Sequence, residues 1–246
     1  MKVVVIGGTG LIGSKVVRRL EVHGHKAVAA APNTGVNSLT GEGLDEVLTG
    51  ASVVIDLSNS PSFEDQAVLD FFRTATSNVL AAEKKAGVGH HVALSIVGTE
   101  RSPQIGYFRA KIAQEELIEA SGIPFSLVHA TQFFEFVKAI ADTSVVDGVV
   151  RIQPVDFQPI AGDDVADQVA KVAVGEPLNA RVDIAGPDKS RMDEFFRKAL
   201  AELNDPREVV TDPEAQYYGA VVSEDALVPT GDAVLGRIHY ADWVKQ

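Results

Sequence analysis

Tyr107 and Lys111 lie four residues apart in a segment with a helical pattern, so both side chains are expected on one helix face. Ser95 stands near the carboxyl end of the apolar run that precedes them. A tyrosine hydroxyl, with a pKa of about 10, can act as a general acid when a nearby ammonium lowers that pKa. The three residues therefore predict carbonyl reduction, with Tyr107 as proton donor, Ser95 bonded to the carbonyl oxygen and Lys111 reaching the cofactor ribose.

Such chemistry needs a hydride carrier, and the first twenty residues predict where it binds. An apolar run, 3–6, leads directly into Gly7-Gly8-Thr9-Gly10-Leu11-Ile12-Gly13 and then into a helical pattern. Strand, glycine-rich turn and helix follow in the order that a dinucleotide site requires. We expect Gly7 to make the tight turn, Gly10 to admit the diphosphate to the backbone, and Gly13 to let helix and strand pack closely. The predicted contacts are Gly7, Thr9, Gly10, Leu11, Ile12 and Gly13; a turn without a ligand is the alternative.

Predicted strands and helices alternate through the first half of the chain. The strands are 3–6, 25–31, 36–39, 52–57, 91–97 and 124–129, and the helices after the first are 44–48, 63–85 and 107–120. Apolar strands of this kind are typical of a parallel sheet covered on both faces, so the fold class is α/β, a Rossmann-type doubly wound sheet. Beyond residue 130 we expect helices at 133–141, 163–174 and 192–203, a hairpin turning at 147–148, a strand at 181–185 and an irregular tail. We interpret 1–246 as one NAD(P)-binding domain, with a core of about 1–132 and a substrate-side part of about 133–246.

Composition excludes several other functions. The formal charge of -12 argues against a nucleic-acid surface, and the absence of cysteine excludes disulfides and thiolate metal sites. His90 and His91 have no ligand partners at metal spacing, so we assign them to a turn and predict no metal. No apolar run approaches the roughly 18 residues of a membrane helix, and the first strand begins almost at Met1. We therefore expect a cytoplasmic protein whose partner is a small-molecule substrate, without nucleic acid or membrane; the oligomeric state stays open.

The segment 30–37, Ala-Ala-Pro-Asn-Thr-Gly-Val-Asn, follows the second strand, where the adenosine ribose binds in this type of fold. It has neither the acidic residue that favours NAD nor the arginine that favours NADP. Absence of a carboxylate removes repulsion against a 2′-phosphate, and Asn33 and Thr34 could donate hydrogen bonds to it. The prediction leans slightly to NADP over NAD. Phe133, after the strand 124–129, is the candidate wall of a substrate pocket, with core packing as the alternative.

With these motifs the chain resembles the short-chain dehydrogenase/reductase superfamily, and more narrowly its atypical, NmrA-like branch of NAD(P)H-binding proteins. The residues that carry the resemblance are 7–13, Ser95, 107–111 (Tyr-Phe-Arg-Ala-Lys), 113–117, 121–125 and 130–134, and it fades after about Gly186. It implies that Lys111 binds the nicotinamide ribose. It also implies that the cofactor is lined by Leu57, Ser58, Asn59, Ser95, Ile96, Val97, His129, Ala130 and Thr131. The loop from Ser95 to Tyr107 is short for the superfamily, and members of this branch often lack a working tyrosine and act as redox sensors or quinone reductases.

Together these features predict an NAD(P)H-dependent oxidoreductase that reduces a small carbonyl or quinone by hydride transfer. The alternative is an NAD(P)-sensing regulatory protein without turnover, which the branch resemblance also allows. An isomerase or epimerase with a tightly held cofactor is less favoured. The loop before Tyr107 and the C-terminal part are small for a nucleotide-sugar pocket.

Overall fold

The computed structural model describes residues 1–245, which form two compact units. The first comprises Met1–Ser95, Gly106–His129 and Val165–Val182, and the second comprises Ile96–Ile105, Ala130–Asp164 and the chain from Asp183 onward. The chain thus enters the second unit for a short loop before it completes the first.

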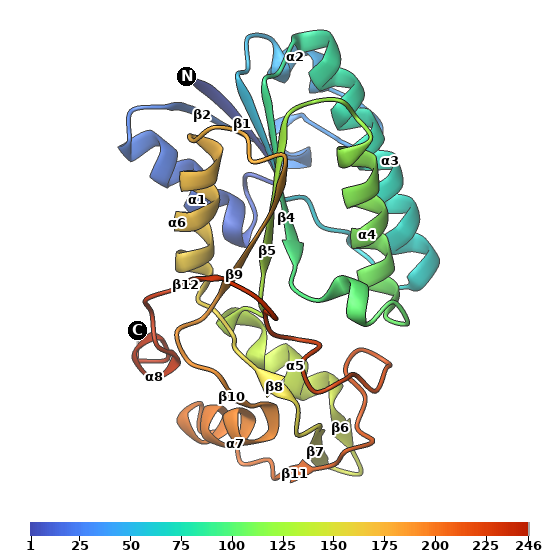
Figure 1. Cartoon of the computed structure of the whole chain (residues 1–246), viewed down its shortest axis with the longest axis vertical. Coiled ribbons are helices and arrows are strands. Elements are labelled where there is room, and N and C mark those ends of the chain that lie inside the picture. The colour runs from blue at the N-terminus through green and yellow to red at the C-terminus, as the bar shows by residue number, and fades with distance from the viewer. Residues whose placement is uncertain (246) are drawn as a thin grey trace. The chain divides into compact units, whose positions relative to one another are not determined.

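A parallel sheet dominates the first unit, as the alternating apolar pattern predicts. Its elements are β1 (Lys2–Ile6), α1 (Leu11–Val22), β2 (Lys26–Ala30), α2 (Leu44–Leu48), β3 (Val53–Asp56), α3 (Asp65–Ala86), β4 (His90–Ile96), α4 (Gly106–Glu119), β5 (Phe125–Ala130) and α6 (Gly162–Ala173). Together with β9 (Ala180–Ala185) and β12 (Val234–Leu235), which lie partly or wholly in the second unit, its strands form a seven-stranded sheet in the order β12-β9-β5-β4-β3-β1-β2. Figure 1 shows α1 and α6 on one face of the sheet and α3 and α4 on the other. This is the predicted doubly wound α/β fold.

Strand register brings the carboxyl ends of three strands to one edge. Ile6 of β1 pairs with Ala30 of β2 and with Asp56 of β3, and Asp56 pairs with Ala93 of β4, all in parallel. All four residues of β3 are buried, because helices cover both faces of the sheet. Whatever follows these strands therefore gathers at that edge, where ligands of open α/β sheets bind.

The predicted strand at 36–39 is wrong. The Asn37 side chain accepts a hydrogen bond from the Leu39 amide at 2.9 Å, which turns the backbone locally. Asn78 of α3 donates to the carbonyls of Ser38 and Leu39, so these backbone groups do not enter a sheet. Asn37 keeps only an isolated bridge to Glu42. The side-chain hydrogen bonds of Asn37 and Asn78 thus hold this segment in a turn, although the apolar residues Val36 and Leu39 favour a strand.

The second unit holds shorter elements. They are a 3-10 turn (Phe134–Phe136), α5 (Val137–Thr143), β6 (Val145–Val146), β7 (Val149–Ile152), β8 (Asp156–Phe157), β9 (Ala180–Ala185), β10 (Ser190–Arg191), α7 (Met192–Glu202), β11 (Val209–Thr211), β12 (Val234–Leu235) and α8 (Tyr240–Trp243). The predicted hairpin is confirmed: β6 and β7 are antiparallel, and Asp147 and Gly148 have φ values of 52° and 82°, as a tight hairpin turn requires. The helix expected at 133–141 begins as the 3-10 turn, and the tail contains β11, β12 and α8.

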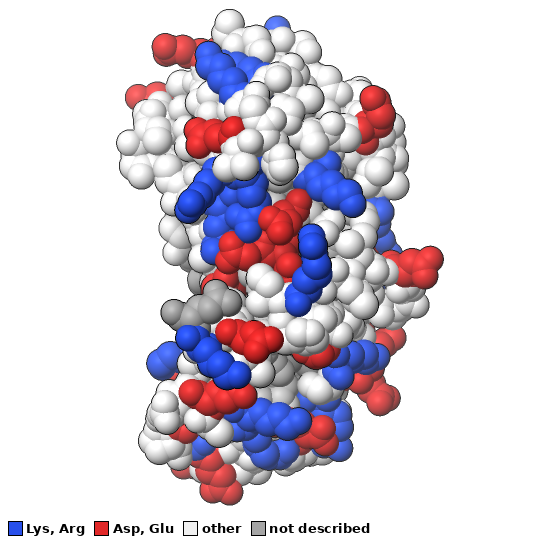
Figure 2. Space-filling view, turned by 90° about the vertical axis from the view of Figure 1, so that its left-hand side faces the viewer, with Lys and Arg blue, Asp and Glu red and all other residues white. Residues whose placement is uncertain are grey.

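Charged side chains of both signs lie next to one another on the face that Figure 2 presents. Arg19 of α1 and Asp167 of α6 form an ion pair. Exposed pairs of this kind contribute about 0–1 kcal/mol each. No helix within residues 1–245 is long and apolar enough to cross a membrane.

Candidate functional site

The turn between β1 and α1 shows which glycines the fold itself requires. Gly7 has a φ of +73°, and a Cβ there would lie 2.5 Å from the Leu57 carbonyl oxygen. A Cβ on Gly13 would overlap the carbonyl oxygen of Gly7, and one on Gly8 would lie 2.7 Å from the Ala29 Cα. At Gly10, by contrast, an added Cβ would approach only the Gly7 carbonyl oxygen, at 3.3 Å. Close packing thus explains Gly7, Gly8 and Gly13, whereas Gly10 borders space in which a ligand could lie.

Helix α1 begins at this space without a side-chain cap. Its N-cap residue is Gly10, and its first turn contains no acidic residue. Leu11, the first helical residue, is 41% exposed. The first-turn N–H groups of a helix have no partner within the helix, and they carry the positive end of its dipole. A diphosphate is the kind of group that fits such an end.

Asn33, after β2, is brought to the glycine turn by Thr9. The Thr9 hydroxyl donates to Asn33 Oδ1 at 3.1 Å, which leaves the Nδ2 hydrogens of Asn33 to serve a ligand. The Thr34 hydroxyl instead accepts from the Ala31 amide and donates to the Ala31 carbonyl oxygen, both at 2.9 Å. Of the two predicted donors, Thr34 donates its hydroxyl hydrogen to the backbone of the turn, whereas the contact of Asn33 with Thr9 uses its side-chain oxygen and not its N–H groups.

Ser58 carries an unpaired buried hydroxyl next to the glycine turn. Asp56, the last residue of β3, accepts a hydrogen bond from the Ser58 amide at 2.9 Å and so shapes the loop that follows. The Ser58 backbone nitrogen would be 3.0 Å from a Cβ on Gly7. Within residues 1–245, the Ser58 Oγ is buried and has no hydrogen-bond partner. A buried hydroxyl without a partner is costly, which fits a ligand at this position.

Ser95 is paired with a carboxylate that the sequence did not single out. It is 3% exposed, and its hydroxyl donates to Glu115 Oε1 on α4. The other oxygen of Glu115 lies 3.1 Å from His129 Nε2 on β5. Burial raises the pKa of Glu115, but the neighbouring His129 imidazole and the Ser95 hydroxyl outweigh burial, so the pKa lies below its usual value. Glu115 lies four residues after Lys111, a spacing that could have placed it on the same helix face.

Lys111 is bonded within the first unit. It is 3% exposed, its ammonium donates to the Leu94 carbonyl oxygen at 2.8 Å and to Gln114 Oε1, and it lies 4.5 Å from the centre of the Phe72 ring. Gln114 in turn donates to Asp56 Oδ2 at 3.0 Å. Burial lowers the pKa of Lys111 to about 8, against the opposing charges of Asp56 and Glu115.

Tyr107 contacts the loop after β3. Its hydroxyl donates to Asn59 Oδ1 at 2.6 Å, and its ring lies 5.8 Å, centre to centre, from both Phe63 and Phe72. Tyr107, Lys111 and Ser95 thus come from neighbouring elements, as predicted. Each donates to a different partner inside the protein: Asn59 for Tyr107, Leu94 and Gln114 for Lys111, and Glu115 for Ser95.

The remaining predicted residues lie in the second unit. Val97, Ala130 and Thr131 are buried, and the Val97 amide donates to the Ala130 carbonyl oxygen at 3.0 Å. The Thr131 hydroxyl donates to the Gln158 carbonyl oxygen at 2.6 Å. Phe133 is half-buried and stacks on Phe136 at 5.6 Å, while Ile96 ends β4.

His90 and His91 lie inside β4, so their assignment to a turn is wrong. His91 Nδ1 lies 2.7 Å from Glu83 Oε1 on α3, with both side chains fully buried, and His90 Nε2 lies 2.8 Å from Ser126 Oγ. These nonlocal partners allow two imidazoles to be buried within a strand. Within the described chain, no group of three His, Cys, Asp or Glu residues could hold a metal ion.

No protein-family model matches the chain. Among curated proteins it is similar to the chloroplastic divinyl chlorophyllide a 8-vinyl-reductase of Cucumis sativus, with 28% identity over 227 residues that cover 76% of this chain and 53% of that protein. It is also similar to the photosystem II assembly factor Ycf39 of Cyanophora paradoxa, with 27% identity over 149 residues that cover 55% and 46%. The chain spans about half the length of these relatives. These relatives support the resemblance of the sequence to the atypical, NmrA-like branch of the short-chain dehydrogenase/reductases.

Solved structures of nucleotide-bound proteins share the fold. MoeE5 in complex with UDP-glucose and NAD has a TM-score of 0.76 and 17% identity, covering 100% of this chain and 98% of that one. The NADPH-dependent quinone oxidoreductase QOR2 of Escherichia coli, complexed with NADPH, has a TM-score of 0.67 and 20% identity, covering 85% and 77%. At 17% and 20% identity, these likenesses show the shared fold. The resemblance implies that Lys111 binds a nicotinamide ribose, whereas in the structure its ammonium donates to the Leu94 carbonyl oxygen and to Gln114 Oε1.

Proposed function

We propose that this chain is an NAD(P)H-dependent oxidoreductase that reduces a small quinone or carbonyl compound by hydride transfer. Bound NAD(P)H would supply the hydride. The observation that carries the proposal is the open space at Gly10. This space lies at the N-terminus of α1, which has no side-chain cap, and the neighbouring glycines Gly7, Gly8 and Gly13 are required by close packing. The amides of that turn would bind the diphosphate, and the unpaired Ser58 hydroxyl would bind a polar group of the nicotinamide half.

We favour NADP over NAD because of Asn33. Thr9 holds the Asn33 side chain by its oxygen, so its N–H groups would point to the ribose that binds after β2. Two N–H donors suit a 2′-phosphate, and residues 30–37 contain no carboxylate to repel it.

We favour a quinone over an isolated carbonyl because of the bonding of Tyr107 and Lys111. Reduction of an isolated carbonyl needs an acid at the developing alkoxide. Tyr107 donates to Asn59, and the Lys111 ammonium that should lower its pKa is bonded to Leu94 and Gln114. A quinone accepts a hydride to give a hydroquinone anion, in which the charge is delocalised and which water can protonate. QOR2 is a quinone oxidoreductase and the Cucumis sativus relative is a vinyl-reductase, and both names are consistent with a conjugated acceptor.

The test is NADPH and NADH oxidation with a panel of quinones and aldehydes, for the wild type, Tyr107→Phe and the matched control Tyr218→Phe. We expect turnover with quinones, little with aldehydes, and quinone rates within about twofold of wild type in both variants. A loss of turnover of 10²-fold or more in Tyr107→Phe alone would assign the proton to Tyr107. If the protein binds neither NADH nor NADPH and neither oxidised form, the proposed function is refuted.

A further inference from the structure

Ser95 lies just beyond the strand ends that surround the glycine turn. Ile6, Asp56 and Ala93 form one row across β1, β3 and β4, and Gly7 and Leu57 follow the first two strands directly. Ser95 is two residues past that row, which is roughly 7 Å further along β4 at about 3.3 Å per residue. It therefore projects beyond the ends of β1 and β3, at the edge where ligands of this fold bind.

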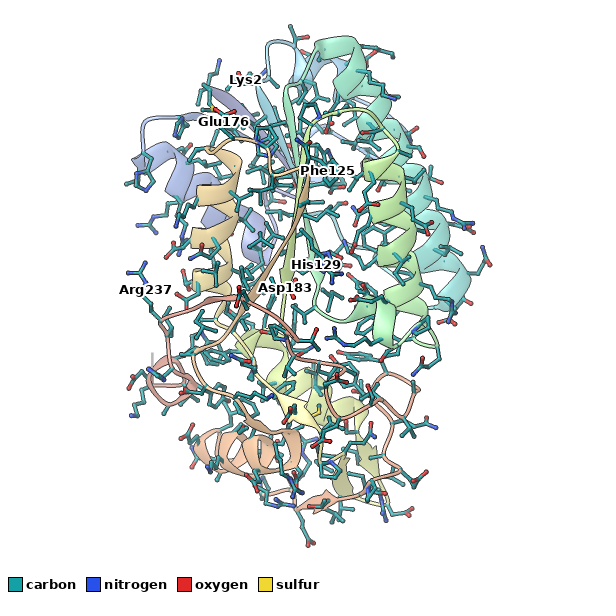
Figure 3. All side chains as sticks on the ribbon, in the orientation of Figure 1. Lys2, Phe125, His129, Glu176, Asp183 and Arg237 are labelled. Atoms are coloured by element: carbon teal, nitrogen blue, oxygen red, sulfur yellow. The ribbon has the colours of Figure 1, made fainter. Side chains whose placement is uncertain are left out.

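Glu115 is a carboxylate buried next to Ser95. Its side chain is 15% exposed and its neighbour His129 is 1% exposed. Figure 3 labels His129, a residue of β5 whose side chain points toward α4. Burying a charged group costs several kcal/mol unless it is well paired, and apolar side chains often stabilise such a position better. The two oxygens of Glu115 are used separately, one toward Ser95 and one toward His129.

An ionised carboxylate only accepts hydrogen bonds, so the single hydroxyl hydrogen of Ser95 must point to Glu115. The remaining lone pairs of Ser95 Oγ can then only accept. We propose that Glu115, flanked by His129, fixes Ser95 as a hydrogen-bond acceptor for the carboxamide N–H of a bound nicotinamide. In this role Ser95 recognises the cofactor. It does not donate to a substrate carbonyl oxygen, which is the role that the sequence pattern predicts.

The carboxamide is the donor that the geometry favours. Asn33, after β2, marks the adenosine side of the glycine turn, so the nicotinamide half must extend the other way, over β3 and β4. The carboxamide NH₂ is the only N–H donor on the nicotinamide ring. This inference rests on the proposed function, because it requires a dinucleotide to bind.

The experiment compares the affinity for NADP⁺ with that for its 3-acetylpyridine analogue, in which a methyl group replaces the NH₂. Calorimetry on the wild type should show the analogue binding about 2- to 12-fold more weakly, which is the range for one hydrogen bond. In Ser95→Ala, the affinity for NADP⁺ should fall to that for the analogue, so that the ratio of the two dissociation constants approaches 1. Glu115→Leu should also bring the ratio toward 1, because Ser95 could then turn its hydrogen outward. Glu115→Asp, with a shorter carboxylate, repeats this test if the leucine variant does not fold.

The control is Ser126→Ala, a buried serine of β5 that contacts His90 and the Leu178 amide. It should leave the ratio at its wild-type value even if the protein is less stable. A ratio that stays at the wild-type value in Ser95→Ala, or in both Glu115 variants, overturns the inference and leaves the proposed function standing. Failure of the wild type to bind either nucleotide refutes the proposed function itself.

Discussion

Gly10→Ala and Gly13→Ala should separate ligand binding from folding within one turn. Gly10 has a φ of -79° and a ψ of -175°, which alanine adopts without strain, and its new Cβ would approach only the Gly7 carbonyl oxygen, at 3.3 Å. We expect a loss of folding stability below about 1 kcal/mol, because the change is an exposed N-cap substitution. At Gly13 the Cβ would overlap the Gly7 carbonyl oxygen, and forced overpacking typically costs about 1–3 kcal/mol.

Dinucleotide affinity should show the opposite order. A methyl group at Gly10 would keep the diphosphate from the first-turn amides, and one or two lost hydrogen bonds to a charged group are worth about 1.5–3 kcal/mol each. The dissociation constant for NADPH should therefore rise by about 10-fold or more in Gly10→Ala. Calorimetric titration with NADPH and thermal unfolding of both variants give the two quantities.

Gly24→Ala is a matched control outside the turn, since a Cβ there meets nothing within 4 Å; its φ of +78° makes a small stability loss the expected effect. Equal NADPH affinity for Gly10→Ala and the wild type would refute the reasoning, because the open space at Gly10 would then not be the diphosphate site. A Gly10→Ala protein as unstable as Gly13→Ala would show that Gly10 is required by packing instead.

Two further predictions concern charge. Asn33→Asp keeps the acceptor for Thr9 but places a carboxylate at the ribose, so NADP⁺ should bind at least about 10-fold more weakly while NAD⁺ is little changed, as measured by titration with each nucleotide. Equal losses for both would contradict a 2′-phosphate contact. Because the pKa of Lys111 is about 8 in the folded protein and 10.5 for an unperturbed lysine side chain, the folded state releases this proton first as pH rises. Relative to Lys111→Met, the free energy of unfolding should therefore rise by up to about 3 kcal/mol between pH 8 and pH 10.5 and should not change below pH 8. Denaturant titrations of both proteins across this pH range measure the difference. Parallel curves of unfolding free energy against pH would contradict the burial of a charged Lys111.

The features that the sequence predicted correctly depend on local demands. The glycine turn is recognisable because tight turning at Gly7 and close packing at Gly13 exclude other residues, and the buried strands are recognisable because helices cover both faces. The segment 36–39 fails because an Asn37 side chain redirects its own backbone, a competition that apolar spacing does not report. The sequence pattern does not predict the partners of Ser95, for a different reason. Glu115 and His129 come from other elements, so only the folded chain brings them together.

The bonding of Lys111 also links α4 to the loop that follows β3. Lys111 bonds the Leu94 carbonyl of β4 and, through Gln114, the Asp56 carboxylate at the end of β3. The second oxygen of Asp56 holds the Ser58 amide, and all of Asp56, Gln114 and Lys111 are at most 3% exposed. Such a buried chain is rigid only while every member is bonded, because each unpaired group would cost about 1–3 kcal/mol. Lys111 thus helps to fix the loop of Ser58, whose Oγ is buried without a hydrogen-bond partner among residues 1–245. Under the proposed function, this hydroxyl would meet the bound dinucleotide.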